Sequence, residues 1–502
     1  MVVTEPAPAF SLPTVDAGSR GLADLVADGP AVIVFVAEEC PTCVLALRRL
    51  AALVAPLSAA GVTLTAVFED EPEVAARVTR RTGFGGPVFA EPAPYEVSQA
   101  YGLETLPTTV LVDTDGAIAG RVVGWDRVGL QALMEQAGVE PGTARVTSEP
   151  PELKPGCAAK NTYDAATLEA LDSGDEAEEM YSLGWTDGLP VVPPTPERVQ
   201  AMLGSYDPDR SLGPVPPSMG EATVRRVAAC AVLAGCRPAY FPVVLAAVEA
   251  ALDPASNVGG QAVTTQPAGQ LLVVNGPVRE RVGLHSGTGV LGPGFRPNLT
   301  IGRALRLVIT LTGGARPGGL DRSTLGQPGK IGICIAEDEE TSPWESFAVE
   351  RGFDPGASTV TLVACDSPLS ISDHRSRTPE ELAWALGSAA ATQWAPAWWP
   401  LDEPSLYVIC PEHAALFRDA GWTKEQVRRA IFEAVRRPAR ELRRAETTPA
   451  VHAADPDTVV HKWSDPEQIL LVVAGGEAGR YSAVFGPCTG MDAAVVTREI
   501  RP

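Results

Sequence analysis

Two cysteines separated by two residues are the part of this sequence best suited to chemistry. The motif CPTC, residues 40–43, follows an apolar run over residues 31–36 and opens a helical pattern over residues 44–57. A thiol at a helix start faces unpaired backbone amides and the positive end of the helix dipole, which favour the thiolate. Cys43 then lies one turn from Cys40, where it can attack a mixed disulfide and release the partner reduced. The spacing predicts reversible thiol-disulfide exchange.

The elements around this motif predict a small α/β domain. Strand patterns alternate with helical patterns, and an Asp-Gly pair predicts a hairpin turn. The strands are expected at 31–36, 62–68 and 108–112, the helices at 44–57, 72–81 and 127–137, and the turn at 115–116.

A segment rich in proline and glycine follows this domain. Residues 140–160 are expected to lack regular structure and to form a linker, in which Cys157 lies. We therefore predict a domain over residues 1–140, a linker over 141–175 and a larger α/β or α+β domain over 176–502.

Residues 5–138 resemble the thioredoxin-like superfamily, particularly its branch of bacterial thiol reductases and peroxiredoxin-like proteins. The resemblance rests on PAPAFSLP at residues 6–13, the strand that leads into CPTC, and YGLETLPTT at residues 101–109. It implies a thioredoxin fold and oxidoreductase activity through a redox-active disulfide between Cys40 and Cys43, with no other cofactor. It also implies that the peptide bond before Pro107 is cis, and that Pro107 faces the cysteine pair, helps to present substrate backbone and excludes metal.

Two positions depart from the thioredoxin pattern. Val34 stands where thioredoxins keep a buried acid as proton shuttle, and Glu39 replaces the usual tryptophan before the first cysteine. Glu38 and Glu39 are expected to oppose ionisation of Cys40 by like-charge repulsion, so we do not predict a strong oxidant. Two alternatives stay open: inert cysteines in a degenerate thioredoxin fold, and a zinc site. The chain has no second CxxC pair, so we predict no metal.

Cys236 has the strongest electrostatic argument for reactivity among the remaining cysteines. Residues 218–221 have the spacing of a capping box, and a helical pattern follows over residues 222–234. Arg237 and the start of a further helix are expected to favour the thiolate of Cys236. We predict that Cys236 exchanges with the CPTC pair, with Cys365 as the closest competitor. A packing role in a helix-helix turn is the alternative.

A glycine-rich segment, residues 283–294, surrounds His285 and Ser286. The helix predicted after it carries Arg303 and Arg306, whose guanidinium groups suit a carboxylate or phosphate. These four residues are candidate substrate-binding residues for a small anion. Glycines that only form turns are an equally good interpretation.

One histidine is a candidate general acid or base. His374 follows Asp373 shortly after a strand pattern over residues 359–364, and strand ends in α/β folds often face a ligand. The alternative is a solvated loop histidine paired with Asp373.

The bulk composition limits the partners. The chain has 502 residues, a net charge of -22 and 45% hydrophobic residues, which is typical of a folded acidic protein. Such a charge repels nucleic acid and anionic lipid, so we expect neither as a partner. The first residues lack the pattern of a secretory signal, and the nine cysteines are too sparse for a disulfide framework, so we expect a cytoplasmic location.

The leading functional hypothesis is a two-domain thiol-disulfide oxidoreductase. Its CPTC pair exchanges electrons between a thiol or disulfide partner and a fused thiol-dependent catalytic domain that acts on a small molecule. Residues 176–502 resemble an uncharacterised bacterial domain, which implies no activity. The alternatives are a thiol peroxidase, whose usual PxxxTxxC loop is absent, and a non-enzymatic binding protein with a thioredoxin-like docking module.

Overall fold

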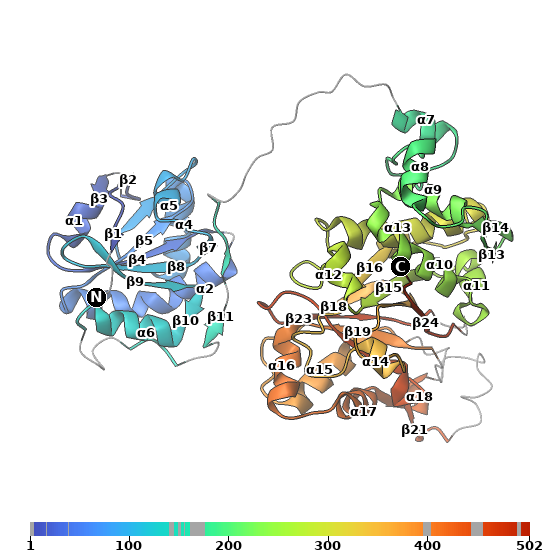
Figure 1. The fold of residues 1–502 in the computed structure, drawn as a ribbon. Coiled ribbons are helices and arrows are strands. Elements are labelled where there is room, and N and C mark those ends of the chain that lie inside the picture. Colours follow the sequence, from blue (N-terminus) through green and yellow to red (C-terminus); the bar gives the residue numbers. More distant parts are fainter. Residues whose placement is uncertain are drawn as a thin grey trace. The chain divides into compact units, whose positions relative to one another are not determined.

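The computed structural model describes most of the chain and divides it into two compact units, Met1–Leu171 and Asp172–Pro502 (Figure 1). Each unit has its own sheets and its own core. The described residues are 5–16, 18–38, 40–139, 145–148, 152–154, 156–160, 176–394, 403–442, 455–488 and 493–501.

Unit 1 is built on a six-stranded sheet, drawn in blue and cyan in Figure 1. In sheet order the strands are β1 (Glu5–Pro6), β9 (Ala117–Val123), β8 (Thr108–Val112), β4 (Ala31–Val36), β5 (Thr63–Phe68) and β6 (Val88–Ala90). The pairs β4–β5 and β5–β6 are parallel, whereas β8 runs antiparallel to β4. Every side chain of β4 is buried, because the strand is apolar at all six positions and central in the sheet. The α/β prediction with a thioredoxin-like sheet is confirmed.

The helices of unit 1 pack on this sheet. They include α2 (Pro41–Leu50), α3 (Val54–Ala59), α4 (Pro72–Thr82) and α6 (Arg127–Gln136). The helix expected over residues 44–57 begins earlier, at Pro41, and a 3-10 turn divides it. Among the described residues, one helical stretch, Pro41–Ala59, has the length and hydropathy of a membrane span. Its leucines at 47, 50 and 57 are buried in the core of unit 1, which explains the apolar composition.

The segment expected to lack regular structure contains two short strands. β11 (Leu153–Lys154) pairs antiparallel with β10 (Trp125–Asp126), and β12 (Cys157–Ala158) pairs antiparallel with β7 (Thr105–Leu106). The expectation is therefore wrong over these residues. Gly156 lies between the two strands and not within either of them, so it separates them without preventing pairing.

Unit 2 contains two four-stranded sheets with the same pattern of strand pairing. In each, a central strand pairs with one parallel and one antiparallel neighbour, and the antiparallel neighbour pairs with an edge strand. The first sheet is β16 (Ile333–Ala336), β15 (Gly269–Asn275), β17 (Thr359–Cys365) and β24 (Val496–Glu499); the second is β22 (Ile469–Val473), β19 (Ser405–Ile409), β23 (Tyr481–Phe485) and β18 (Pro368–Ser372).

The chain crosses between these sheets twice. β18 follows β17 directly but belongs to the second sheet, and β24 follows β23 but belongs to the first. The segment that forms most of the first sheet therefore adds β18 to the second sheet, and the segment that forms most of the second sheet adds β24 to the first. The two sheets consequently share one core, to which β15, β17, β19 and β22 all contribute.

Helices cover the outer faces of both sheets in unit 2 (Figure 1). On the first sheet lie α10 (Phe241–Ala251) and α13 (Arg296–Leu307), and α9 (Val224–Ala234) packs against α13. The helices of the second half are α15 (Pro379–Thr392), α16 (Pro411–Asp419) and α17 (Lys424–Ala434). The capping box predicted at residues 218–221 is wrong, because β14 (Gly220–Thr223) occupies its last two positions. Thr223 caps α9 instead, and its side chain accepts the backbone N–H of Arg226.

Candidate active site

The cysteine pair lies where the parallel strand β4 gives way to α2. Cys40 is the N-cap residue of α2, and Pro41 occupies the first helical position. The Sγ of Cys40 accepts the backbone N–H of Cys43 at 3.3 Å, which places the two cysteines one turn apart. Both are buried thiols, with Cys40 2% exposed and Cys43 fully enclosed. The predicted helix start at the motif is confirmed.

The loop before β8 lies against this pair. The Leu106–Pro107 peptide bond is cis, as predicted. The thiol of Cys40 donates to the carbonyl oxygen of Leu106 at 3.4 Å. The structure therefore brings the residue before Pro107 into direct contact with Cys40, across 66 positions of sequence.

One of the two glutamates expected to oppose the Cys40 thiolate is paired. The guanidinium group of Arg77, on α4, donates to both carboxylate oxygens of Glu38, at 2.6 and 3.2 Å. This bond lowers the pKa of Glu38 and compensates its charge. Sequence reasoning treated Glu38 as unpaired, because Arg77 lies 39 residues away. Glu39 lies outside the described residues.

Two acidic residues follow β5 at the same edge of the sheet. The Glu69 carboxylate accepts the backbone N–H of Lys160 at 2.5 Å, and burial raises its pKa. Asp70 accepts the Lys160 ammonium at 2.6 Å and the backbone N–H of Glu38 at 2.8 Å. Sequence reasoning missed these residues, although two acids directly after a buried strand, at the edge that also holds Cys40, were a usable signal.

This geometry can be compared with known proteins. Residues 3–121 match the AhpC/TSA family. The cysteine pair lies within the matched segment, and unit 1 has a thioredoxin-like sheet. No curated protein matches the chain.

Three solved structures that are similar to part of this chain each cover a third of it or less. A hypothetical protein from Sinorhizobium meliloti 1021 shares 21% identity over 33% of this chain and 97% of its own, with a TM-score of 0.27. A putative thiol:disulfide interchange protein DsbE from Chlorobium tepidum shares 24% identity over 26% and 93%, with a TM-score of 0.25. Peroxidoxin BcpB from Mycobacterium tuberculosis shares 18% identity over 28% and 97%, with a TM-score of 0.25.

The expected low pKa of Cys236 in unit 2 is wrong. Cys236 is 7% exposed and follows the C-cap glycine of α9, and burial raises its pKa to about 12. Its thiol donates to the carbonyl oxygen of Thr300 at 3.3 Å. The nearby Arg296 and Arg303 lower this pKa, but less than burial raises it. Burial likewise raises the pKa of the other described cysteines of unit 2, which are Cys230, Cys334, Cys365, Cys410 and Cys488.

The candidate anion-binding arginines are held in ion pairs. Arg303 makes a bidentate salt bridge with Asp187, and both N···O distances are 2.7 Å. Arg306 is buried and donates to Asp321 at 2.6 Å. Both carboxylates come from outside the helix, so the sequence around α13 did not reveal that these charges are compensated.

The candidate histidines are not brought together. The Nε2 of His285 contacts the carbonyl oxygen of Thr288 at 2.8 Å, and its ring stacks on Phe295. The backbone carbonyl of Ser286 accepts the N–H of Gly475 at 2.7 Å, which is a structural contact.

His374 is exposed and packs against the edge of Tyr481. The Asp373 carboxylate accepts the backbone N–H groups of Arg375 and Ser376, at 2.9 and 3.0 Å, and so holds the turn. His413 is the buried histidine of this region, and its Nε2 lies 3.0 Å from the carbonyl oxygen of Asp373.

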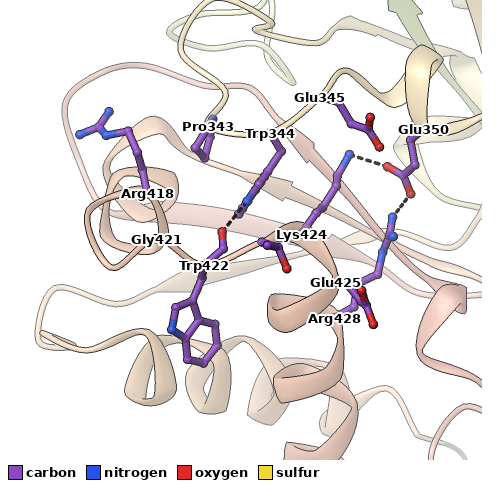
Figure 2. Close-up of a pocket in the computed structure, with 11 residues that line it drawn as sticks. Pro343, Trp344, Glu345, Glu350, Arg418, Gly421, Trp422, Lys424, Glu425 and Arg428 are labelled. Carbon is purple, nitrogen blue, oxygen red and sulfur yellow. Dashed lines mark hydrogen bonds and ion pairs between the residues drawn. The ribbon is translucent and has the colours of Figure 1, made fainter.

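Unit 2 has a cavity of about 570 Å³ that the sequence did not indicate (Figure 2). Trp344 and Trp422 line it, and the indole N–H of Trp344 donates to the carbonyl of Trp422 at 2.9 Å. Figure 2 shows Lys424 and Arg428 both directed at the carboxylate of Glu350, which pairs with both cations. Glu467 is a second carboxylate partner of Arg428. The cavity is thus aromatic on one side and carries a cluster of ion pairs on the other.

Proposed function

We propose that unit 1 is a thiol-disulfide oxidoreductase in which Cys40 is the nucleophile and Cys43 resolves the mixed disulfide. The observation that carries this proposal is the bond from the Cys43 N–H to the Sγ of Cys40 at the N-terminus of α2. That amide and the dipole of a ten-residue helix stabilise negative charge on Cys40. The match of residues 3–121 to the AhpC/TSA family supports it.

In the reducing direction the exchange has two steps. The Cys40 thiolate attacks a disulfide of the partner, which forms a mixed disulfide and releases one partner thiolate. Cys43 then loses its proton and attacks the Sγ of Cys40, so that the Cys40–Cys43 disulfide forms and the second partner sulfur leaves as a thiolate. The released thiolates take up protons from solvent. The two electrons come from the Cys40 and Cys43 thiols.

A thiol peroxidase is the rival function. It would use Cys40 to attack a peroxide oxygen and Cys43 to resolve the sulfenic acid with release of water. The spacing of the two cysteines serves both reactions, so the assay must distinguish them. A catalytic function for unit 2 that receives electrons from the cysteine pair is part of the same proposal, with the aromatic cavity as its binding site for a small molecule.

Insulin reduction by dithiothreitol tests the proposal in the full chain. We expect the wild type to accelerate the reaction, Cys40→Ser to abolish the acceleration, and Cys43→Ser to accumulate mixed disulfide. Cys410→Ser, at a cysteine of unit 2, is the matched control and should behave as wild type. Hydrogen peroxide consumption faster than insulin reduction would favour the peroxidase, and wild type without effect in either assay would refute both.

A further inference from the structure

A third cysteine of unit 1 pairs with the residue that Cys40 contacts. In the β7–β12 ladder, Cys157 is the Cα partner of Leu106, and Ala158 is the partner of Thr105. Opposed residues of an antiparallel pair have Cα atoms about 4.5–5.5 Å apart. The carbonyl of this same Leu106 accepts the Cys40 thiol at 3.4 Å. The chain therefore places Cys157 on the strand that lies next to the reactive loop.

The approach of this strand depends on a glycine. A Cβ added at Gly156 would overlap the carbonyl oxygen of Leu106, so a larger residue at this position would push the strand away. Because Gly156 has no side chain, its backbone can lie against the Leu106 carbonyl group, which also accepts the hydrogen bond from Cys40. Close approach of two backbones is one of the reasons for a glycine in an extended segment.

Three further contacts fix the strand after Cys157. The backbone N–H of Ala159 donates to the carbonyl of Glu104 at 3.0 Å. Lys160 then binds both acids that follow β5, through its backbone N–H to Glu69 at 2.5 Å and through its ammonium to Asp70 at 2.6 Å. The Lys160 and Asp70 side chains are only 14% and 5% exposed, so the loss of either partner leaves a largely buried charge and costs more than the loss of a surface ion pair. The segment is docked along the active-site edge.

We propose that Cys157 is a third redox cysteine, the internal exchange partner of Cys40. This inference rests on the proposed function of the CPTC pair. The Cys157 thiolate attacks the Sγ of Cys40 in the Cys40–Cys43 disulfide, so that the Cys40–Cys157 bond forms and the Cys40–Cys43 bond breaks. The proton that Cys157 loses passes through solvent to Cys43. The exchange conserves electrons and needs no added oxidant.

The docked strand gives Cys157 an advantage over the cysteines of unit 2. A cysteine on a strand that pairs with the loop in contact with Cys40 reacts within one unit, at a high effective concentration. Burial raises the pKa of Cys236 to about 12, which leaves little thiolate at neutral pH. Cys157 is therefore the better candidate for the first internal acceptor.

Disulfide mapping of the full-chain Cys43→Ser variant tests this inference. After oxidation with glutathione disulfide and alkylation, trypsin, which does not cut before proline, releases Cys157 in the peptide of residues 146–160 and Cys236 in the peptide of residues 227–279. We expect most Cys40 to be linked to the first peptide, and the link to be lost in the Cys43→Ser/Cys157→Ser variant. Gly156→Val, which displaces the strand without removing a thiol, should reduce the link strongly.

Each other outcome has a defined meaning. A link from Cys40 to Cys236, or glutathione on Cys40 without any internal link, would overturn the inference while the proposed function stands. Cys40 that forms neither an internal disulfide nor a glutathione adduct would refute the proposed function. The same mapping on wild type after limited oxidation guards against an effect of the serine, since both the Cys40–Cys43 and Cys40–Cys157 pairs should appear.

Discussion

The ion pair between Lys160 and Asp70 should determine much of the free energy with which residues 156–160 dock on the rest of unit 1. Lys160→Met removes the ammonium and leaves the Asp70 carboxylate, 5% exposed on its side chain, without that partner when the segment is docked. Removing one partner of a buried pair costs about 3–5 kcal/mol. The segment can undock and hydrate Asp70, so we take about 3 kcal/mol as the loss of docking free energy. At about 1.4 kcal/mol per tenfold, the undocked population rises about a hundredfold.

Amide hydrogen exchange measures this change. The N–H groups of Ala159 and Lys160 are bonded to Glu104 and Glu69 only when the segment is docked, so both should exchange about a hundredfold faster in Lys160→Met. Arg127→Met is the matched control, because it breaks an ion pair with Glu152 whose side chains are 29% and 64% exposed. Such a pair contributes about 1 kcal/mol or less. Equal exchange rates in the two variants would refute the anchoring argument.

Three further predictions concern charge and burial. Burial lowers the pKa of Lys462 from 10.5 to about 7. Between pH 7 and pH 10.5 the Lys462 ammonium is therefore protonated in the unfolded chain but not in the folded one, so the stability of unit 2 rises with pH over this range. Lys462→Met should raise the free energy of unfolding of unit 2 by about 5 kcal/mol below pH 7, and this gain should shrink as the pH rises above 7. Urea unfolding at several pH values measures the gain, and a gain that does not depend on pH would contradict the prediction. Native Cys236 should resist iodoacetamide at pH 8 until the chain is unfolded, and rapid labelling would exclude the buried environment. Arg77→Gln should slow alkylation of Cys40 because Glu38 loses its partner, whereas Arg80→Gln on the same exposed helix should not.

Local sequence patterns were sufficient for the elements that hold the cysteine pair. The strands expected at residues 31–36 and 108–112 are β4 and β8 with the same bounds, because continuous apolar runs between turn residues admit few alternatives. The helix start at the CPTC motif followed from the apolar run before the motif and the helical pattern after it, and the structure adds that Pro41 is the first helical residue.

Local sequence patterns could not identify the partners of charged side chains or of the short strands. Arg303 binds Asp187 from 116 residues away, and β12 pairs with β7 across about 50 residues, so neither contact leaves a periodic signal. The pKa of Cys236 was predicted in the wrong direction because helix termini and Arg237 were considered without burial, which is the larger effect here. Thr223 was missed as a cap because the short strand before it carries no alternation of apolar residues.

Redox equilibration of the full chain tests the central claim most directly. The protein is incubated in dithiothreitol buffers of graded potential, quenched with acid, alkylated and analysed by mass spectrometry at residues 40, 43 and 157. We predict that Cys40 loses alkylation in one two-electron transition, matched by the summed loss at Cys43 and Cys157, while alkylation of Cys230 and Cys334 after unfolding stays constant. Cys40 and Cys43 that remain fully alkylated across every buffer would contradict the account.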